Sequence, residues 1–308
     1  MNLVYIHMGY FELNYKNIRY APSPHAYASD KLPEYIFDSI RNSRTFYKGP
    51  IHVIVDKAEA AKHQKRFEEL GCIVHETEDL ITNSHIPNFL SLIADEFPNI
   101  FNDHFLAVTF MRLLLLEALA AKEKLVEVVH IENDNLIYVD LEKCVFDKSR
   151  SVWYTPVSPN LDSAGFLYFT DHKNYGVFCT KLLGFLARGY EQCRVLAMSD
   201  MITEMHVLNI VRSENPNLVG ALPILPNPSL TVIFDGASWG QYLGGSNNGH
   251  PAGTTFPHQI AGVEIAKHKH EYKFNWKDRG LWLNYDNRDY QFINLHVHNK
   301  VRIKEFIK

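Results

Sequence analysis

The sequence predicts an α/β protein with a mixed, mostly parallel sheet that is flanked by helices and carries added antiparallel strands in its C-terminal half. Three observations support this fold class. Short β-branched runs alternate with helical patterns over residues 1–140, which is the order of elements in a parallel sheet with right-handed crossovers. The run at residues 51–56 is almost continuously apolar, as expected of a strand covered on both faces. Aromatic and polar residues alternate over residues 271–276 and 290–298, which is typical of antiparallel strands.

The N-terminal half has the most regular pattern. Gly71 ends one of its helical segments, and the segments near residues 86–96 and 106–122 are too densely apolar to face solvent. Ligands of parallel sheets bind outside the carboxyl ends of the strands, so polar residues at those ends are candidates for a site. Strands are expected at residues 3–7, 51–56, 72–75 and 126–131, and helices near residues 33–42, 58–70, 86–96 and 106–122.

The C-terminal half is less regular. Residues 236–253 are rich in glycine and are expected to form a loop. No stretch has the composition of a linker, so we expect a single domain over residues 1–308. Further strands are expected at residues 165–169 and 230–234, and further helices near residues 175–190 and 200–211.

Composition excludes several classes of protein. Apolar residues make up 46% and charged residues 21% of the chain, which is typical of a globular enzyme. The formal net charge is -4, so there is no basic field with which to hold nucleic acid. The four cysteines are far apart and form no C-x-x-C pair, which favours reduced structural thiols over disulfides or a thiolate zinc site.

The same patterns predict a cytoplasmic protein with no integral membrane segment. Residues 1–7 lack the basic and long apolar regions of a signal peptide. The most apolar helical stretch, residues 113–121, is interrupted by Glu117, preceded by Arg112, and expected to be too short to span a bilayer.

Glu132, Asn133 and Asp134 form an acidic triplet directly after the strand expected at residues 126–131. In an extended chain the side chains of Glu132 and Asp134 point the same way and can share one hard cation, which suits Mg²⁺ or Mn²⁺ on a diphosphate. A turn is the competing interpretation, because Asn and Asp favour turns. The apolar residues on both sides of the triplet weigh against a turn at the surface.

The segment around this triplet resembles a known family. A helix with Arg112, a short β-run and the sequence ENDNLIYVD at residues 132–140 are similar to the region of the DxD motif in GT-A glycosyltransferases, and the closest comparison is with families related to glycogenin and the bacterial galactosyltransferases. The resemblance implies a GT-A (Rossmann-like) fold in which the triplet holds Mn²⁺ or Mg²⁺ on the diphosphate of a nucleotide-sugar donor, with Arg112 near the donor. Glu132 stands where the family has Asp, and its longer side chain can ligate directly or through water.

The resemblance also implies that the two halves of the chain bind different substrates. Residues 1–140 would be the nucleotide-binding half, with a UDP-sugar as the preferred donor, and residues 141–308 the half that binds the sugar and the acceptor. The enzyme would be a hexosyltransferase, and its acceptor a carbohydrate or glycoconjugate.

Two histidines near the C-terminus are candidate metal ligands. Alternation over residues 293–298 places His296 and His298 on one face of a strand, and imidazole is a good ligand for transition metals. A chain with 16 histidines contains such pairs by chance, and His268 and His270 form another. The resemblance implies a late histidine that closes the metal site and a lysine that follows it near the phosphates. His296 is therefore preferred as the third ligand, His298 is the alternative, and Lys300 is a phosphate contact.

Polar residues at two other strand ends are candidates for nucleotide contacts. Asp56 follows the strand at residues 51–56 and can accept hydrogen bonds from a base or ribose, while His7 can flank the base. Helix capping is the alternative role for Asp56.

Asp200 and Asp235 are the candidates for a catalytic carboxylate. Asp200 follows the small-residue strand at residues 163–169, where the family has a polar or acidic residue against the donor sugar, and an N-cap is the alternative role. Asp235 opens the glycine-rich segment, where Trp239 and Tyr242 offer flat faces for sugar stacking. Packing of these aromatic rings on the protein body is the alternative.

The sequence thus favours a metal-dependent glycosyltransferase over three other functions. A non-catalytic nucleotide-sugar or carbohydrate-binding protein on the same scaffold is the main alternative. A sugar nucleotidylyltransferase would need a glycine-rich basic loop after the first strand, which residues 7–13 do not provide. A metal hydrolase built on the two histidine pairs is the least favoured. An inverting transferase would need a carboxylate base, for which Asp162, Asp200 and Asp235 are available, whereas a retaining enzyme needs none.

Overall fold

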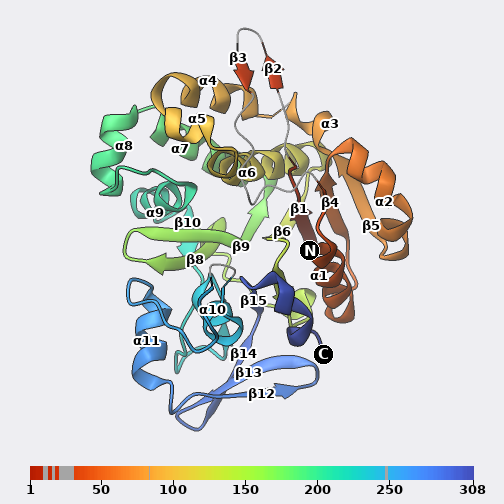
Figure 1. Ribbon diagram of the computed structural model, residues 1–308, viewed down its shortest axis with the longest axis vertical. Coiled ribbons are helices and arrows are strands. Elements are labelled where there is room, and N and C mark those ends of the chain that lie inside the picture. The colour runs from red at the N-terminus through yellow and green to blue at the C-terminus, as the bar shows by residue number, and fades with distance from the viewer. Residues whose placement is uncertain (10–12, 16–17, 21–30, 83, 247–248) are drawn as a thin grey trace.

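A seven-stranded mixed sheet forms the centre of the computed structural model, which describes residues 1–9, 13–15, 18–20, 31–82, 84–246 and 249–308 (Figure 1). Its strand order is β10-β8-β9-β6-β1-β4-β5. Neighbouring strands are parallel except where β9 pairs with β6 and β8. The mixed, mostly parallel sheet expected from the sequence is therefore confirmed. The strands are β1 (Asn2–Ile6), β4 (Ile51–Val55), β5 (Cys72–Glu76), β6 (Val126–Ile131), β8 (Val152–Ser158), β9 (Leu161–Asp171) and β10 (Val219–Ala221).

Helices cover both faces of this sheet. Alternate residues of β1 enter different cores: Val4 and Ile6 pack with α4, α6 and α7, whereas Leu3 and Tyr5 pack with α1 and α2. This two-sided burial explains why the strands read as continuous apolar runs. The helices of this part are α1 (Glu34–Phe46), α2 (Lys57–Glu69), α3 (Thr77–Ile81), α4 (Ile86–Glu96), α5 (Pro98–Asn102), α6 (His104–Glu123), α7 (His172–Leu186), α8 (Tyr190–Ala197) and α9 (Glu204–Glu214).

Helix α6 corrects one expectation from the sequence. It has 20 residues and is long and apolar enough to cross a membrane by length and composition, so the expectation that it is too short was wrong. However, 67% of its most apolar window is buried inside the protein, where it packs against the sheet and α7. It is a core helix, and its N-terminus is capped by Asp103, which accepts the N–H of Leu106.

A second, four-stranded sheet with order β11-β14-β13-β12 occupies the C-terminal part of the chain (Figure 1). Strands β12, β13 and β14 are antiparallel, which confirms the antiparallel additions expected in this half. The elements are β11 (Val232–Ile233), α10 (Ser238–Gly244), α11 (Ile260–His268), β12 (Lys273–Lys277), β13 (Gly280–Tyr285) and β14 (Arg288–Phe292). The described residues also include two short 3₁₀ helices, η1 (Leu141–Lys143) and η2 (Lys300–Phe306), and the hairpin of β2 (Leu13–Tyr15) and β3 (Ile18–Tyr20).

Two local predictions in this half were wrong. The glycine-rich segment at residues 236–253 contains helix α10 and is not entirely a loop. The helix needs glycine at Gly240, because a Cβ atom there would lie 1.8 Å from the carbonyl oxygen of His296. The strand expected at residues 290–298 is divided into β14 and β15 (Asn294–His296), which belong to different sheets.

Strand β15 connects the two halves of the protein. It pairs antiparallel with β7 (Asn135–Ile137), the short strand that follows the acidic triplet. Backbone hydrogen bonds from Val297 to Asp134 and from Tyr138 to Ile293 extend this pairing at both ends. The pairing places His296 beside the triplet.

Candidate metal centre

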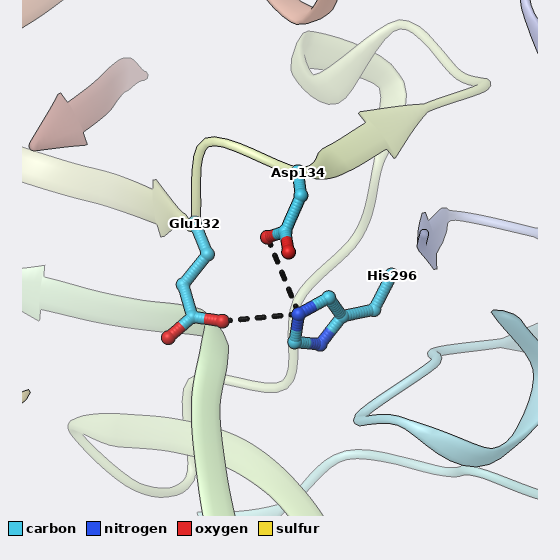
Figure 2. Close-up of side chains that lie close together, drawn as sticks. All are labelled: Glu132, Asp134 and His296. Atoms are coloured by element: carbon cyan, nitrogen blue, oxygen red, sulfur yellow. Dashed lines mark ion pairs between the residues drawn. The ribbon is translucent and has the colours of Figure 1, made fainter. Parts of the chain in front are cut away.

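Glu132, Asp134 and His296 meet in one cluster (Figure 2). The Nε2 atom of His296 lies 3.1 Å from Oε2 of Glu132 and 3.3 Å from Oδ1 of Asp134. One ligand atom from each residue lies within 4.8 Å of the other two. Two carboxylate oxygens and one imidazole nitrogen are thus close enough to share one cation.

The triplet is held in a tight, buried turn between β6 and β7. The N–H of Asn135 donates to the carbonyl of Glu132 at 2.9 Å, and the N–H of Glu132 donates to Gly165 on β9 at 3.0 Å. Asp134 is only 6% exposed. The two interpretations of the sequence are therefore compatible: the residues form a turn, and the turn directs both carboxylates inward.

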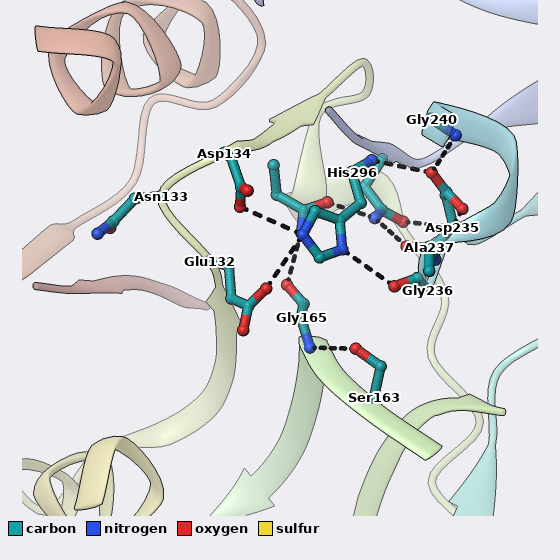
Figure 3. Close-up of polar contacts among 12 residues, drawn as sticks. Glu132, Asn133, Asp134, Ser163, Gly165, Asp235, Gly236, Ala237, Gly240 and His296 are labelled. Carbon is teal, nitrogen blue, oxygen red and sulfur yellow. Dashed lines mark hydrogen bonds and ion pairs between the residues drawn. The ribbon is translucent and has the colours of Figure 1, made fainter. Parts of the chain in front are cut away.

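The imidazole of His296 is oriented by its second nitrogen. Nδ1 lies 3.0 Å from the carbonyl oxygen of Gly236, which can only accept, so Nδ1 carries the hydrogen (Figure 3). Nε2 is then the atom that faces the carboxylates, and a backbone carbonyl partner of this kind is typical of a metal-binding histidine. Burial lowers the pKa of His296, but Asp134 and Glu132 outweigh it and raise this pKa well above its usual value. Without a cation, a proton on Nε2 bridges the two carboxylates.

Two cations balance the carboxylates. The guanidinium of Arg112 on α6 lies 2.6 Å from Oε1 of Glu132, and Nζ of Lys300 lies 2.5 Å from Oδ2 of Asp134. Each carboxylate therefore turns one oxygen to a cation and the other to His296. Burial alone would raise the pKa values of both acids. Arg112 and His296 lower that of Glu132, and His296 and Lys300 lower that of Asp134 well below its usual value. Both side chains are in the ionised form that binds metal.

Gly165 leaves room for the cluster. A Cβ atom at this position would lie 3.2 Å from Oε2 of Glu132 and 3.2 Å from Nδ1 of His296. Its N–H donates to Oγ of Ser163 at 3.0 Å (Figure 3). The small-residue strand that the sequence associates with the donor sugar thus permits close approach of the ligand side chains themselves.

Asp235, a candidate catalytic carboxylate, is engaged by backbone donors. The side chain is fully buried and accepts four backbone N–H groups, from Ala237, Trp239, Gly240 and His296 (Figure 3). Burial raises the pKa of Asp235, and these donors favour its ionised form. Asp235 holds the start of α10 and the backbone of His296, and its assignment as an acid or base stays a prediction.

His298 lies beside the cluster and outside it. Its ring stacks on that of His296, with 4.2 Å between the centroids. Burial lowers the pKa of His298 to about 3, and its Nε2 atom has no hydrogen-bond partner in the part of the chain that the structure describes. Of the two candidate histidines, it is His296 that the structure brings to the carboxylates.

The candidate nucleotide contacts lie at the ends of β1 and β4. Asp56 precedes α2 and accepts the N–H of Gly9 at 3.2 Å. His7 is half-buried, and burial lowers its pKa to about 4. Residues 10–12, part of the segment weighed against a nucleotidylyltransferase, lie outside the described residues. The roles of His7 and Asp56 stay predictions.

Other candidates are engaged elsewhere. Asp200 is 88% exposed and pairs with Arg194 at 3.1 Å. It does not cap α9, whose N-cap is Thr203. Asp162 is buried and pairs with Arg212 at 2.6 Å. The expectation that Trp239 offers a face for sugar stacking was wrong, because this residue is fully buried among aromatic rings and donates to the carbonyl of Ile224; Tyr242 is half-buried near Phe274.

The structure adds residues that the sequence did not single out. Tyr35 on α1 lies beneath Lys300, whose Nζ atom is 5.8 Å from the ring centroid. Glu204 on α9 lies near Arg112 and Glu132, and burial raises its pKa. Asn135 and Asn294 are fully buried between the ligands. One signal was available for Asn294, which shares the face of His296 by alternation.

Comparisons with known proteins give likenesses of structure alone. No protein-family model matches the sequence, and no curated protein matches it. Mouse xyloside xylosyltransferase 1, in its apo form, is similar over 78% of this chain and 90% of its own, with 9% identity and a TM-score of 0.49. The PaToxG glycosyltransferase is similar over 70% and 69%, with 11% identity and a TM-score of 0.44. The apo form of the bifunctional glycosyltransferase WbbM is similar over 82% and 47%, with 12% identity and a TM-score of 0.42.

Proposed function

We propose that this protein is a metal-dependent glycosyltransferase of the GT-A type, which transfers a hexosyl group from a nucleotide-diphosphate donor, a UDP-sugar by preference, to a hydroxyl of a carbohydrate or glycoconjugate. The observation that carries the proposal is the convergence of Glu132, Asp134 and His296 beside two cationic side chains. The resemblance of residues 132–140 to the DxD region supports the same class.

The residues present fit a divalent cation of the Mn²⁺ or Mg²⁺ type. Two ionised carboxylates offer hard oxygen ligands, and the fixed tautomer of His296 offers a nitrogen lone pair, a mixed set that suits Mn²⁺. When bound, the cation would supply Lewis-acid stabilisation of a departing diphosphate.

Arg112 and Lys300 complete the electrostatics of the site. Their two positive charges already balance the carboxylates of Glu132 and Asp134. A divalent cation added to this group leaves an excess of positive charge. This excess can compensate the negative charge of a nucleoside diphosphate. Lys300 is the more exposed of the two cations and is proposed to contact phosphate oxygens, while the more buried Arg112 keeps Glu132 in place. Both groups stabilise negative charge on the leaving group without moving far.

The proposal assigns no general base. Asp162 and Asp235 are buried and fully engaged, and Asp200 is exposed and paired with Arg194. The acceptor hydroxyl therefore has no partner among these three carboxylates, and a retaining transfer, which needs no dedicated base, agrees with their positions.

A panel of nucleotide sugars with and without Mn²⁺ tests the proposal. Slow release of nucleoside diphosphate to water, dependent on Mn²⁺, is the expected result. Asp134→Asn should abolish it, while Asp200→Asn, which changes an exposed carboxylate, should leave it unchanged. Stabilisation by a nucleotide sugar without release would support the binding-protein alternative. Absence of both effects, or release that does not require a divalent metal, would contradict the proposed function.

A further inference from the structure

We propose that Asn135, Asn294 and Asp235 form a clamp that fixes His296 at a set distance from the two carboxylates and so determines which cation the site accepts. This inference rests on the proposed metal site and adds positioning residues that select its cation. The three residues are fully buried, and Asn294 is hydrogen-bonded to each of the other two.

Asn294 is the centre of the clamp. Its Nδ2 atom donates to Oδ1 of Asn135 at 2.6 Å and to the carbonyl oxygen of Asp235 at 2.8 Å. Its Oδ1 atom accepts the N–H of Asp235 at 3.1 Å. One amide therefore joins β15, which carries His296, to β7, which follows Asp134, and to the segment before α10.

Asn135 extends the clamp to the central sheet. Its Nδ2 atom donates to the carbonyl oxygen of Gly165 on β9 at 2.9 Å. The same carbonyl accepts the backbone N–H of Glu132. The turn that carries the acidic ligands is thus fastened to β9 through Glu132 and Asn135, and to Asn294 through Asn135.

Asp235 and Gly236 then fix His296 itself. Oδ2 of Asp235 accepts the backbone N–H of His296 at 3.0 Å, and the carbonyl of Gly236 accepts its ring N–H at 3.0 Å. Backbone and ring are held by adjacent residues, so the direction of Nε2 is set by this segment (Figure 3).

The clamp consists of polar side chains in a buried position, and their stabilising effect on the fold does not by itself explain them. Buried amides stabilise a protein little beyond their apolar equivalents, because their desolvation offsets most of the hydrogen-bond energy. Directional bonds, however, fix geometry more narrowly than packing does. A rigid site with two oxygen ligands and one nitrogen discriminates against Ca²⁺, which prefers six to eight oxygens at longer distances (about 2.3–2.6 Å) in an adaptable shell. Loosening the clamp should lower Mn²⁺ affinity more than Ca²⁺ affinity.

Mn²⁺ binding to the whole protein, followed by the electron paramagnetic resonance signal of free Mn²⁺ and by competition with Ca²⁺, tests this inference. Asn294→Ala and Asn135→Ala should each weaken Mn²⁺ binding by about tenfold, as loss of outer-shell partners does elsewhere. The double variant should lose less than the sum of the two single losses, since the residues share a hydrogen bond. The preference for Mn²⁺ over Ca²⁺ should fall in all three.

Asn209→Ala is the matched control. Asn209 is also buried, and its amide donates to Asp162 at 3.3 Å, away from the cluster. The Asn209→Ala variant should change thermal stability without changing the affinity for Mn²⁺ or the preference for Mn²⁺ over Ca²⁺. If Asn294→Ala does not fold, Asn294→Ser, whose shorter side chain removes the amide but leaves one hydroxyl, is measured in its stead.

The outcomes separate the clamp from the proposed function. Wild-type protein that binds no divalent cation would overturn the metal site and the clamp with it. Wild-type protein that binds Mn²⁺, with unchanged affinity and selectivity in the asparagine variants, would overturn the clamp alone. Equal losses of affinity in the clamp variants and in Asn209→Ala would show a general effect of destabilisation and would also contradict it.

Discussion

The Nζ atom of Lys300 lies 2.5 Å from Oδ2 of Asp134, while Oδ1 of the same carboxylate lies 3.3 Å from the imidazole of His296. Asp134 thus stands between a cation that belongs to the protein and the position at which a metal would bind. Lys300 neutralises a ligand of the metal and also supplies charge for an anion. These two effects oppose each other and can be separated by experiment.

Lys300→Met should affect metal and nucleotide in opposite directions. Without the ammonium, Asp134 regains its full negative charge, so we expect the affinity for Mn²⁺ alone to rise by a few-fold. The affinity of the Mn²⁺-loaded protein for a nucleoside diphosphate should fall by at least tenfold, since a charged hydrogen bond is lost. Titration calorimetry measures both.

Lys304→Met is the control for this prediction, because Lys304 lies on the same 3₁₀ helix and is 77% exposed beside Asp38. It should leave both affinities unchanged. A parallel fall of both affinities in Lys300→Met would show that Lys300 supports the fold of the site and does not compete with the metal.

A pair of glycine substitutions tests how tightly the cluster is packed. Gly165→Ala places a methyl group about as close as 3.1 Å to Oγ of Ser163 and 3.2 Å to ligand atoms of Glu132 and His296. We expect weaker Mn²⁺ binding and a loss of about 1–2 kcal/mol in the free energy of unfolding, which chemical denaturation measures.

Gly184→Ala provides the comparison. Gly184 lies within α7, and a Cβ atom there would meet nothing within 4 Å. Alanine should stabilise that helix by about 0.5–1 kcal/mol and leave metal binding unchanged. Unchanged Mn²⁺ affinity in Gly165→Ala would contradict the close packing of the cluster.

Much of the fold could be predicted because the apolar runs in the sequence are the segments that the folded protein buries. The bounds of β6 and α4 match the expectation, since an apolar run between polar residues leaves little choice of boundary. The acidic triplet was identified for the same reason: it directly follows a buried strand.

The rest depended on contacts between distant parts of the chain. Glycines around α10 indicated a loop, but Gly240 serves the close approach of α10 to His296, and Asp235 supplies the acceptors that begin the helix. The role of Asn294 follows from the pairing of β15 with β7, which no local pattern encodes. The burial of Trp239 could not be predicted either. Its neighbours in the sequence are small, and the aromatic rings that bury it come from distant parts of the chain.

Asp235→Asn distinguishes a positioning role from a catalytic one. An asparagine of the same shape presents an NH₂ group where the carboxylate accepts backbone N–H groups, so one pair of donors loses its partner. The free energy of unfolding should fall by about 2–3 kcal/mol, and Mn²⁺ affinity should fall with it. A catalytic acid or base would instead lower turnover and change its pH profile, with stability and metal affinity unaltered.

Acid should destabilise the protein through a pair of histidines far from the metal centre. The rings of His52 and His75 stack 5.2 Å apart, and Nδ1 of His52 lies 3.0 Å from Nε2 of His75. Burial, with the neighbouring His52 and Lys122, lowers the pKa of His75 from 6.5 to about 4, and burial lowers that of His52. In the unfolded chain both rings take up protons below pH 6.5, whereas in the folded protein His75 resists protonation until about pH 4, and burial makes His52 harder to protonate as well. Stability from this pair is therefore complete above pH 6.5 and is lost as the pH falls toward 4, by about 2 kcal/mol.

Urea unfolding at a series of pH values between 7.5 and 4 measures this loss. His75→Gln removes one titrating ring and should flatten the decline in the free energy of unfolding across that window. His268→Gln, which changes a half-buried histidine beside Glu264 and Glu271, should leave the slope as it is in the wild-type protein. An identical slope in His75→Gln and the wild type would show that the acid sensitivity arises elsewhere, and the stacked pair would then be a packing contact alone.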